Sequence, residues 1–196
     1  RIYEGTNEIN RMLCINMILK RALKGELDLV GTAWAVQKEL TGLPSMDIPT
    51  GPFGIEKRAV QEFKKVLLMV AGAAVKYQMD GKHDLKEQQE VLMNIADIAI
   101  DLYNSESLLL RVQKLYEIKN EAEILPFVAM LKVFLNDAQS RIVKNAQDAL
   151  TSFATGDELK IMLMGIKRFS RYENVNVKEN RRIVAHHIIQ ANHYCY

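Results

Sequence analysis

The chain has 196 residues, of which 48% are apolar and 26% are charged. These values are typical of a globular chain with one sizeable domain or two small ones, and they exclude collagen-like, low-complexity and disulfide-rich classes. The 26 basic and 24 acidic side chains give a net charge of +2, from which we expect no nucleic-acid partner.

Apolar side chains recur at intervals of three and four residues along almost the whole chain, and this pattern predicts an all-α fold. The first helix is predicted over residues 7–23, with a buried face formed by Ile9, Met12, Ile15 and Leu19. A second, shorter helix is expected over residues 27–40, because glycine and proline follow closely after it.

A Pro/Gly-rich linker is predicted over residues 43–54. Prolines and glycines gather in or beside it at a density that no regular helix tolerates. These residues are Gly42, Pro44, Pro49, Gly51, Pro52 and Gly54. The predicted organisation is therefore a first segment of residues 1–42, then the linker, and then a helical-bundle domain over residues 55–196.

Further helices are predicted beyond the linker, over residues 55–79, 84–119, 126–154, 157–172 and 176–188. The small side chains at residues 71–74 favour the close approach of another helix. Three helix starts are predicted from capping side chains and one from a proline in the first turn. The residues are Asp84 with Glu87, Asn176 with Glu179, Asp157, and Pro126. Long helices joined by short turns predict an antiparallel up-and-down bundle, preceded by one or two helices and the linker.

Few side chains outside the N-terminal segment are typical of catalysis or metal binding. Cys14 and Cys195 lack the paired spacing of a zinc site or a disulfide framework. His186, His187 and His193 have no Cys or carboxylate partner at an i, i+4 spacing, so no metal site is predicted. A basic cluster is interpreted as a solvated helix face, and it consists of Lys167, Arg168, Arg171, Arg181 and Arg182.

The first eleven residues carry a more specific signal. They read Arg-Ile-Tyr-Glu-Gly-Thr-Asn-Glu-Ile-Asn-Arg, so that Glu4 and Gly5 stand just before the first predicted helix. The free backbone amides at a helix start favour negatively charged groups nearby, so this position could hold a functional carboxylate or an anionic ligand. A Glu-Gly turn ahead of a helix is nevertheless common, and an exposed loop is its simpler interpretation.

Residues 3–9, Tyr-Glu-Gly-Thr-Asn-Glu-Ile, closely resemble the catalytic-loop motif of acyl-CoA dehydrogenases, whose form is roughly aromatic-Glu-Gly-Thr-x-x-Ile. Residues 94–103 resemble the C-terminal helical extension of the very-long-chain branch of that family, and the predicted linker stands where that branch has one. The chain is therefore identified as a C-terminal portion of a family member, beginning at the motif that contains the catalytic glutamate.

The resemblance implies an FAD-dependent oxidoreductase of fatty-acid β-oxidation that converts a fatty acyl-CoA to a trans-2-enoyl-CoA and passes electrons to an acceptor. Glu4 matches the base that removes the α-proton while the β-hydrogen leaves as hydride to the flavin. Gly5 matches the position that lets the thioester approach closely. Thr6, Asn7 and Glu8 match the stretch that contacts FAD.

The family builds nearly all of its FAD and acyl-CoA pocket from domains that this chain does not include. The chain is therefore expected to be a fragment that is inactive alone and binds no FAD. Glu4 is then expected to be exposed, and apolar patches are expected on the surfaces that would meet the other domains.

An alternative interpretation assigns residues 53–196 to assembly, because the extension that they resemble supports the homodimer in long-chain members of the family. Peripheral membrane docking through residues 27–54 is a further interpretation. Packing of residues 27–42 on the bundle or on absent domains is preferred, because Lys38 is the only cation between residues 27 and 54 and the apolar face is modest. No signal peptide or spanning segment is recognisable, so a cytoplasmic location is expected, or an organelle matrix in a eukaryote.

Overall fold

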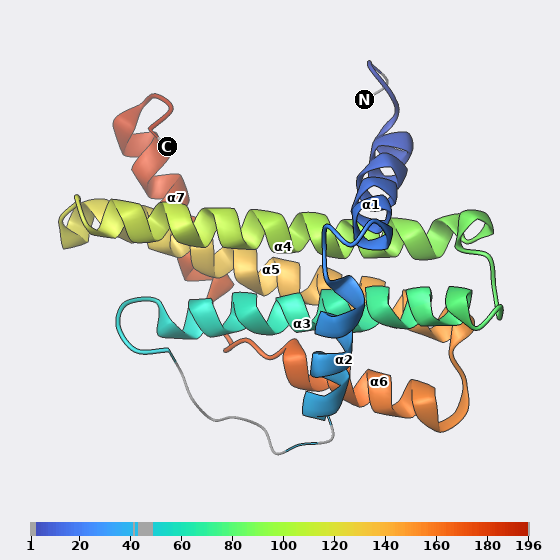
Figure 1. Ribbon diagram of the computed structural model, residues 1–196. Helices are drawn as coiled ribbons and strands as arrows, with labels where there is room; N and C mark the ends of the chain where they lie inside the picture. Colours follow the sequence, from blue (N-terminus) through green and yellow to red (C-terminus); the bar gives the residue numbers. More distant parts are fainter. Residues whose placement is uncertain (1–2, 41, 43–48, 196) are drawn as a thin grey trace.

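The computed structural model describes residues 3–40, 42 and 49–195 (Figure 1). In these residues the chain forms α-helices, one short 3-10 helix and no strand. The elements are α1 (Asn7–Leu23), α2 (Leu29–Leu40), α3 (Gly54–Met79), η1 (Leu85–Glu87), α4 (Gln89–Tyr116), α5 (Glu121–Phe153), α6 (Gly156–Phe169) and α7 (Val177–Ala191). The predicted all-α fold is confirmed.

The helices α3, α4, α5 and α6 form an antiparallel up-and-down bundle, as predicted (Figure 1). Helix α5 packs against α4, α3 and α6, while α7 lies across α5. Helix α1 crosses α4 steeply, and α2 lies over α3. The predicted division into residues 1–42, 43–54 and 55–196 stays a prediction, and residues 43–48 of the linker lie outside the described residues.

The core of the bundle is built from apolar side chains at helical spacing on every one of its four helices. Phe63, Val66 and Val70 of α3 have no exposed surface or nearly none, because the period of three and four places them on one face. The same holds for Ile98 and Val112 of α4, for Leu131, Leu135, Ile142 and Leu150 of α5, and for Ile166 and Phe169 of α6. Burial of each such side chain stabilises the fold by about 1.5–3 kcal/mol.

The start of α5 differs from the prediction. The helix begins at Glu121, not at Pro126, and Pro126 lies inside it. The reason is a capping box: Asn120 Oδ1 accepts a hydrogen bond of 3.0 Å from the backbone N–H of Glu123, and the Glu123 carboxylate accepts one of 3.2 Å from the N–H of Asn120. This reciprocal pair satisfies two helix-end donors, so it starts the helix ahead of the proline.

Two other predicted caps were wrong. Asp84 caps the 3-10 helix η1, through the N–H of Lys86, and α4 begins only at Gln89. Thr155 is the N-cap residue of α6, and Asp157 lies in the first turn with an ion pair of 2.9 Å to Lys160. The cap of α7 was predicted correctly, because Asn176 Oδ1 accepts from the N–H of Glu179 at 3.2 Å.

The buried face of α1 is narrower than predicted. Ile15 is 2% exposed and Met12 and Leu19 are partly buried, but Ile9 is 61% exposed. The steep crossing over α4 explains the difference, because the N-terminal end of α1 projects beyond the bundle (Figure 1). No described helix combines the length and the hydropathy that a membrane-spanning segment requires.

Candidate functional site

The turn that carries Glu4 has an unusual backbone. Glu4 has φ 58° and Gly5 has φ 113°, so both residues lie in the left-handed region. Glycine adopts this conformation freely, whereas a glutamate does so at a cost. The turn lies directly before Thr6, and α1 starts at the next residue.

Thr6 fixes the start of α1. Its Oγ1 accepts a hydrogen bond of 3.2 Å from the N–H of Ile9, which is the usual geometry of a threonine N-cap. Asn10 closes the same turn in two ways: its backbone N–H bonds to the Thr6 carbonyl at 3.0 Å, and its Nδ2 donates to the Gly5 carbonyl at 3.4 Å. A Cβ on Gly5 would lie 3.1 Å from Asn10 Oδ1, so a glycine suits this position.

All five predicted site residues lie together at this end of α1, because they are adjacent in sequence. Glu4, Asn7 and Glu8 are exposed, as was expected for Glu4, while Gly5 and Thr6 are half-buried. The end of α1 offers backbone N–H groups that have no carbonyl partner within the helix. The arrangement therefore combines an accessible carboxylate with hydrogen-bond donors suited to an electron-rich ligand atom.

Helix α1 is held on α4 by one apolar stripe and one ion pair. Ile15 is buried in the contact, and Arg11 Nε donates to Oδ1 of Asp97 at 2.5 Å. Both charged side chains are 32% exposed. The neighbours of Asp97 on α4, Ala96 and Ile98, are fully buried, so the backbone that carries this carboxylate is held in place by the core.

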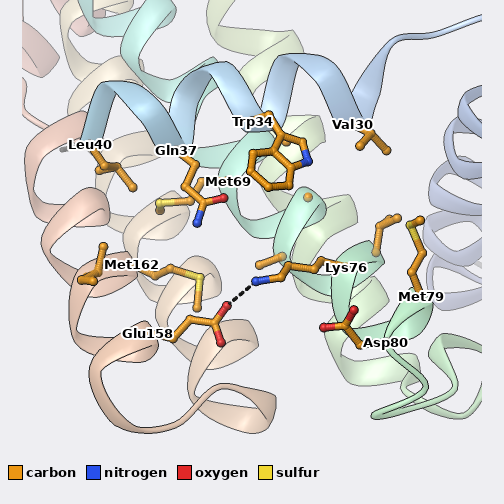
Figure 2. A pocket seen from close by; sticks show the side chains of 15 residues that line it. Val30, Trp34, Gln37, Leu40, Met69, Lys76, Met79, Asp80, Glu158 and Met162 are labelled. Atoms are coloured by element: carbon orange, nitrogen blue, oxygen red, sulfur yellow. Dashed lines mark hydrogen bonds and ion pairs between the residues drawn. The ribbon is translucent and has the colours of Figure 1, made fainter. Parts of the chain in front are cut away.

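A second feature is an apolar groove between α2, α3 and α6, with a volume of about 470 Å³ (Figure 2). Its lining includes Trp34 and Leu40 of α2, Met69 and Met79 of α3, and Met162 of α6. Sequence reasoning missed the groove, since its walls come from three separate segments. The small side chains at residues 71–74 were a partial signal: an added Cβ on Gly72 would lie 2.4 Å from Ala33 Cβ, which confirms the predicted close approach.

The charged edge of this groove connects α3 to α6. Lys76 Nζ lies 3.0 Å from Oε1 of Glu158, and the Tyr77 hydroxyl donates to Oε2 at 2.9 Å. The hydrogen bonds from Lys76 and from Tyr77 lower the pKa of Glu158 below its ordinary value. Burial, followed by the hydrogen bond to the carboxylate, raises the pKa of Tyr77.

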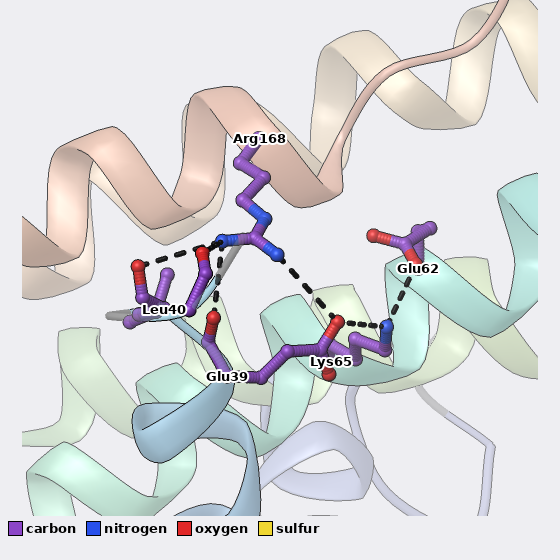
Figure 3. A network of polar contacts seen from close by, with 6 residues as sticks. Glu39, Leu40, Glu62, Lys65 and Arg168 are labelled. Atoms are coloured by element: carbon purple, nitrogen blue, oxygen red, sulfur yellow. Dashed lines mark hydrogen bonds and ion pairs between the residues drawn. The ribbon is translucent and has the colours of Figure 1, made fainter. Parts of the chain in front are cut away.

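The basic cluster of residues 167–182 was interpreted as a solvated helix face, and this was wrong for Arg168. Its Nη1 donates to the carbonyl oxygens of Glu39 and Gly42 at 3.0 Å and of Leu40 at 3.4 Å (Figure 3). These carbonyls are at the C-terminal end of α2, where a cation is favoured by the helix dipole. Lys65 joins the network through ion pairs of 2.7 Å with both Glu39 and Glu62.

Comparisons with known proteins place the chain in a family. The model of the acyl-CoA dehydrogenase C-terminal domain matches residues 62–168, which run from α3 to α6. A probable acyl-CoA dehydrogenase from Bacillus subtilis (strain 168) is 36% identical over 195 residues, covering 99% of this chain and 32% of that protein. An acyl-CoA dehydrogenase from Bacillus anthracis, whose crystal structure was determined in complex with FAD, has a TM-score of 0.90 and 36% identity over 100% of this chain and 32% of that chain.

The chain thus spans less than a third of the length of these relatives. The family match, the identity over nearly the whole chain and the close agreement in fold lead to the same assignment. The chain belongs to the acyl-CoA dehydrogenase family and contains its C-terminal helical domain.

Proposed function

We propose that this chain is the C-terminal helical part of a flavin-dependent acyl-CoA dehydrogenase in which Glu4 is the catalytic base. The observation that carries the proposal is the motif of residues 3–9 on an exposed turn directly before α1. The 36% identity with a probable acyl-CoA dehydrogenase supports it. The substrate is then a fatty acyl-CoA, the product a trans-2-enoyl-CoA, and the process fatty-acid β-oxidation with a separate electron acceptor. The likeness of residues 94–103 supports the very-long-chain-like branch.

Glu4 suits the proposed role because its carboxylate is accessible. It removes the α-proton of the thioester when one of its carboxylate oxygens comes within about 2.6–3.2 Å of the α-carbon. A site that closes over the carboxylate and excludes water raises its basicity. Gly5 leaves room for the thioester beside the base, because it carries no side chain. FAD, when bound, accepts the β-hydrogen as hydride.

The end of α1 also fits a flavin cofactor in its donor chemistry. Thr6 accepts one hydrogen bond from Ile9 and still has its own O–H to donate. The exposed Asn7 side chain and the first-turn amides, including that of Glu8, add further donors for the cofactor's oxygen and nitrogen atoms. These few groups are too small a surface to hold FAD, so the 196-residue chain alone is proposed to bind no FAD and to have no activity.

The test is Glu4→Gln in the complete enzyme to which the chain belongs under this proposal. The variant keeps the size of the side chain but cannot take up the proton, so bleaching of the flavin absorbance by acyl-CoA should be lost while FAD stays bound. Glu26→Gln is the matched control, because Glu26 is an exposed glutamate beyond the other end of α1 that pairs with Arg21. Full flavin reduction in Glu4→Gln would refute the assignment of the base.

A second role, in assembly, is favoured by apolar side chains that stay exposed on the bundle. Ile100, Tyr103 and Leu110 lie on one face of α4 at helical spacing, and Tyr103 is 72% exposed. An exposed apolar stripe of this kind is typical of an interface. We propose that the helical bundle supports a homodimer of the complete enzyme.

Light scattering on the complete enzyme tests this second role. Tyr103→Glu together with Leu110→Glu should lower the measured mass to that of one subunit, whereas Glu4→Gln should leave the mass unchanged. An unchanged mass in the double variant would refute an interface on this face of α4.

A further inference from the structure

The turn that carries Glu4 projects from the bundle, yet a chain of contacts connects it to α4. Asn7, Glu8, Ile9 and Asn10 are all exposed, so the first turn of α1 has no buried apolar side chain to hold it. The nearest apolar side chain of α1 that packs on the core is the partly buried Met12 in the second turn, and the nearest fully buried one is Ile15. Whatever orients the turn must therefore act through polar contacts close to it.

Two such contacts come from adjacent residues. Arg11 donates to Asp97 of α4 at 2.5 Å, which fixes the second turn of α1 on the bundle. Asn10 donates from Nδ2 to the Gly5 carbonyl at 3.4 Å, directly after Glu4. The contact of Arg11 with Asp97 holds α1 on the bundle, and the contact of Asn10 with the Gly5 carbonyl holds the turn on α1. Because residues 10 and 11 are adjacent in one helix, the two contacts together connect the turn to α4.

The anchor on α4 is well suited to transmit a fixed position. Asp97 stands between two fully buried residues of α4, so its backbone cannot shift without disturbing the core. A guanidinium bound to a carboxylate through a charge-assisted hydrogen bond is directional as well as attractive. The partial exposure of both side chains means that the pair adds little to global stability, so its main effect is geometric.

We propose that Arg11 and Asn10 are positioning residues for Glu4, acting through Asp97 and the Gly5 carbonyl respectively. The inference rests on the proposed role of Glu4 as base. Catalysis by a base depends steeply on its placement, and a displacement of about 1 Å can lower a rate by about a hundredfold. Loss of the contact between Arg11 and Asp97 lets the exposed first turn of α1 move, and Glu4 moves with it.

The experiment combines kinetics of the complete, FAD-loaded enzyme with hydrogen exchange of the 196-residue chain. Arg11→Met should lower kcat about tenfold, with a change in KM of less than about twofold, because substrate binding involves many other residues. Amide exchange at residues 7–11 should become faster, and the thermal midpoint should stay nearly unchanged. Lys20→Met, an exposed cation on the same helix, is the control and should match the wild type in all of these measurements.

Charge reversal separates the pair from a general effect of mutation. The double variant Arg11→Asp with Asp97→Arg should recover most of the lost kcat and the slow exchange, whereas each single reversal should not. Asn10→Ala should lower kcat without changing the exchange of α1 beyond its first turn. Unchanged kcat in Arg11→Met, or no recovery in the double variant, would overturn the proposal.

Failure of this inference can be told apart from failure of the proposed function. If Glu4→Gln keeps full activity, Glu4 is not the base, and a positioning role toward it falls with that result. The exchange of residues 7–11 still shows whether Arg11 holds this end of α1. If Glu4→Gln is inactive but Arg11→Met is fully active, the base stands and the positioning role is refuted.

Discussion

The hydroxyl of Tyr77 in α3 donates a hydrogen bond of 2.9 Å to Oε2 of Glu158 in α6. Lys76 approaches the other oxygen of the same carboxylate, at 3.0 Å. Two successive residues of α3 thus converge on a single acceptor of α6. The contact joins the two helices at the edge of the apolar groove (Figure 2), and it makes their association sensitive to the charge of Glu158.

Acid should weaken this contact. The pKa of Glu158 is lower in the folded chain than its ordinary value of 4.5, so the charged form stabilises the fold above that value. This contribution disappears as the pH falls through the folded pKa. In urea unfolding, the stability advantage of the wild type over Glu158→Gln should be constant from about pH 7 to about pH 5 and shrink by less than about 1 kcal/mol toward about pH 3. A constant difference down to pH 3 would contradict the assignment.

Arg168→Ala should loosen α2 more than the bundle. The substitution removes the donor that three carbonyls at the end of α2 share, and hydrogen bonds to a charged donor contribute about 1.5–3 kcal/mol. Trp34, the only tryptophan of the chain, lies on α2 and faces the groove, so it reports on the docking of α2 against α3 and α6. Its fluorescence should change at a lower urea concentration than the helical circular dichroism does. Arg171→Ala, which changes an exposed neighbour, is the control. If fluorescence and circular dichroism of Arg168→Ala changed at the same urea concentration, the prediction would be wrong.

Two glycines should respond differently to alanine. Alanine improves helix propensity by about 1 kcal/mol at either position. At Gly72 the new Cβ would meet Ala33 Cβ at 2.4 Å, an atom fixed to the backbone of α2, and overpacking of this kind costs about 1–3 kcal/mol. At Gly165 the close atoms are the flexible ends of Leu40 and Met69, which can turn away. Thermal unfolding should therefore show Gly72→Ala to be destabilised, with Gly165→Ala within about 1 kcal/mol of the wild type.

In the ion pair between α4 and α5, removing the arginine should cost more stability than removing the aspartate. Asp101 is 9% exposed and accepts from Arg141 Nε at 2.9 Å and from Nη2 at 2.7 Å, whereas the Arg141 side chain is 47% exposed. Removing the arginine leaves a buried carboxylate, while removing the carboxylate leaves a cation that water can reach. Arg141→Met should cost about 2–3 kcal/mol and Asp101→Asn about 1 kcal/mol in urea unfolding. Equal losses, or the reverse order, would contradict this account.

The helices were predictable because their signal is local. The spacing of Val66 and Val70, or of Ile98 and Leu102, shows within a few residues which face is buried. The start of α5 was also readable, since Asn120 and Glu123 have capping-box spacing, but Pro126 drew the predicted boundary downstream. The capping box and the proline predict different starts for α5, and the helix begins where the reciprocal hydrogen bonds of the capping box place it.

Contacts between distant segments could not be predicted in the same way. Arg168 and Gly42 are 126 positions apart, so nothing near either residue indicates that one binds the other. The exposure of Ile9 likewise depends on how steeply α1 crosses α4, which no periodicity encodes. For the candidate site, the motif of residues 3–9 gave its residues, whereas the contacts of Asn10 and Arg11 became visible only in three dimensions.

The left-handed backbone of Glu4 sets stability against chemistry at a single position. A glutamate pays about 1 kcal/mol or more for a φ of 58°, and glycine or asparagine would adopt the same turn at lower cost. A search for thermostable variants would therefore favour replacing the one carboxylate on which the proposed reaction depends. Stabilising substitutions at position 4 are predicted to be easy to obtain but to abolish the proposed activity. A stability screen on this chain should therefore leave Glu4 unchanged.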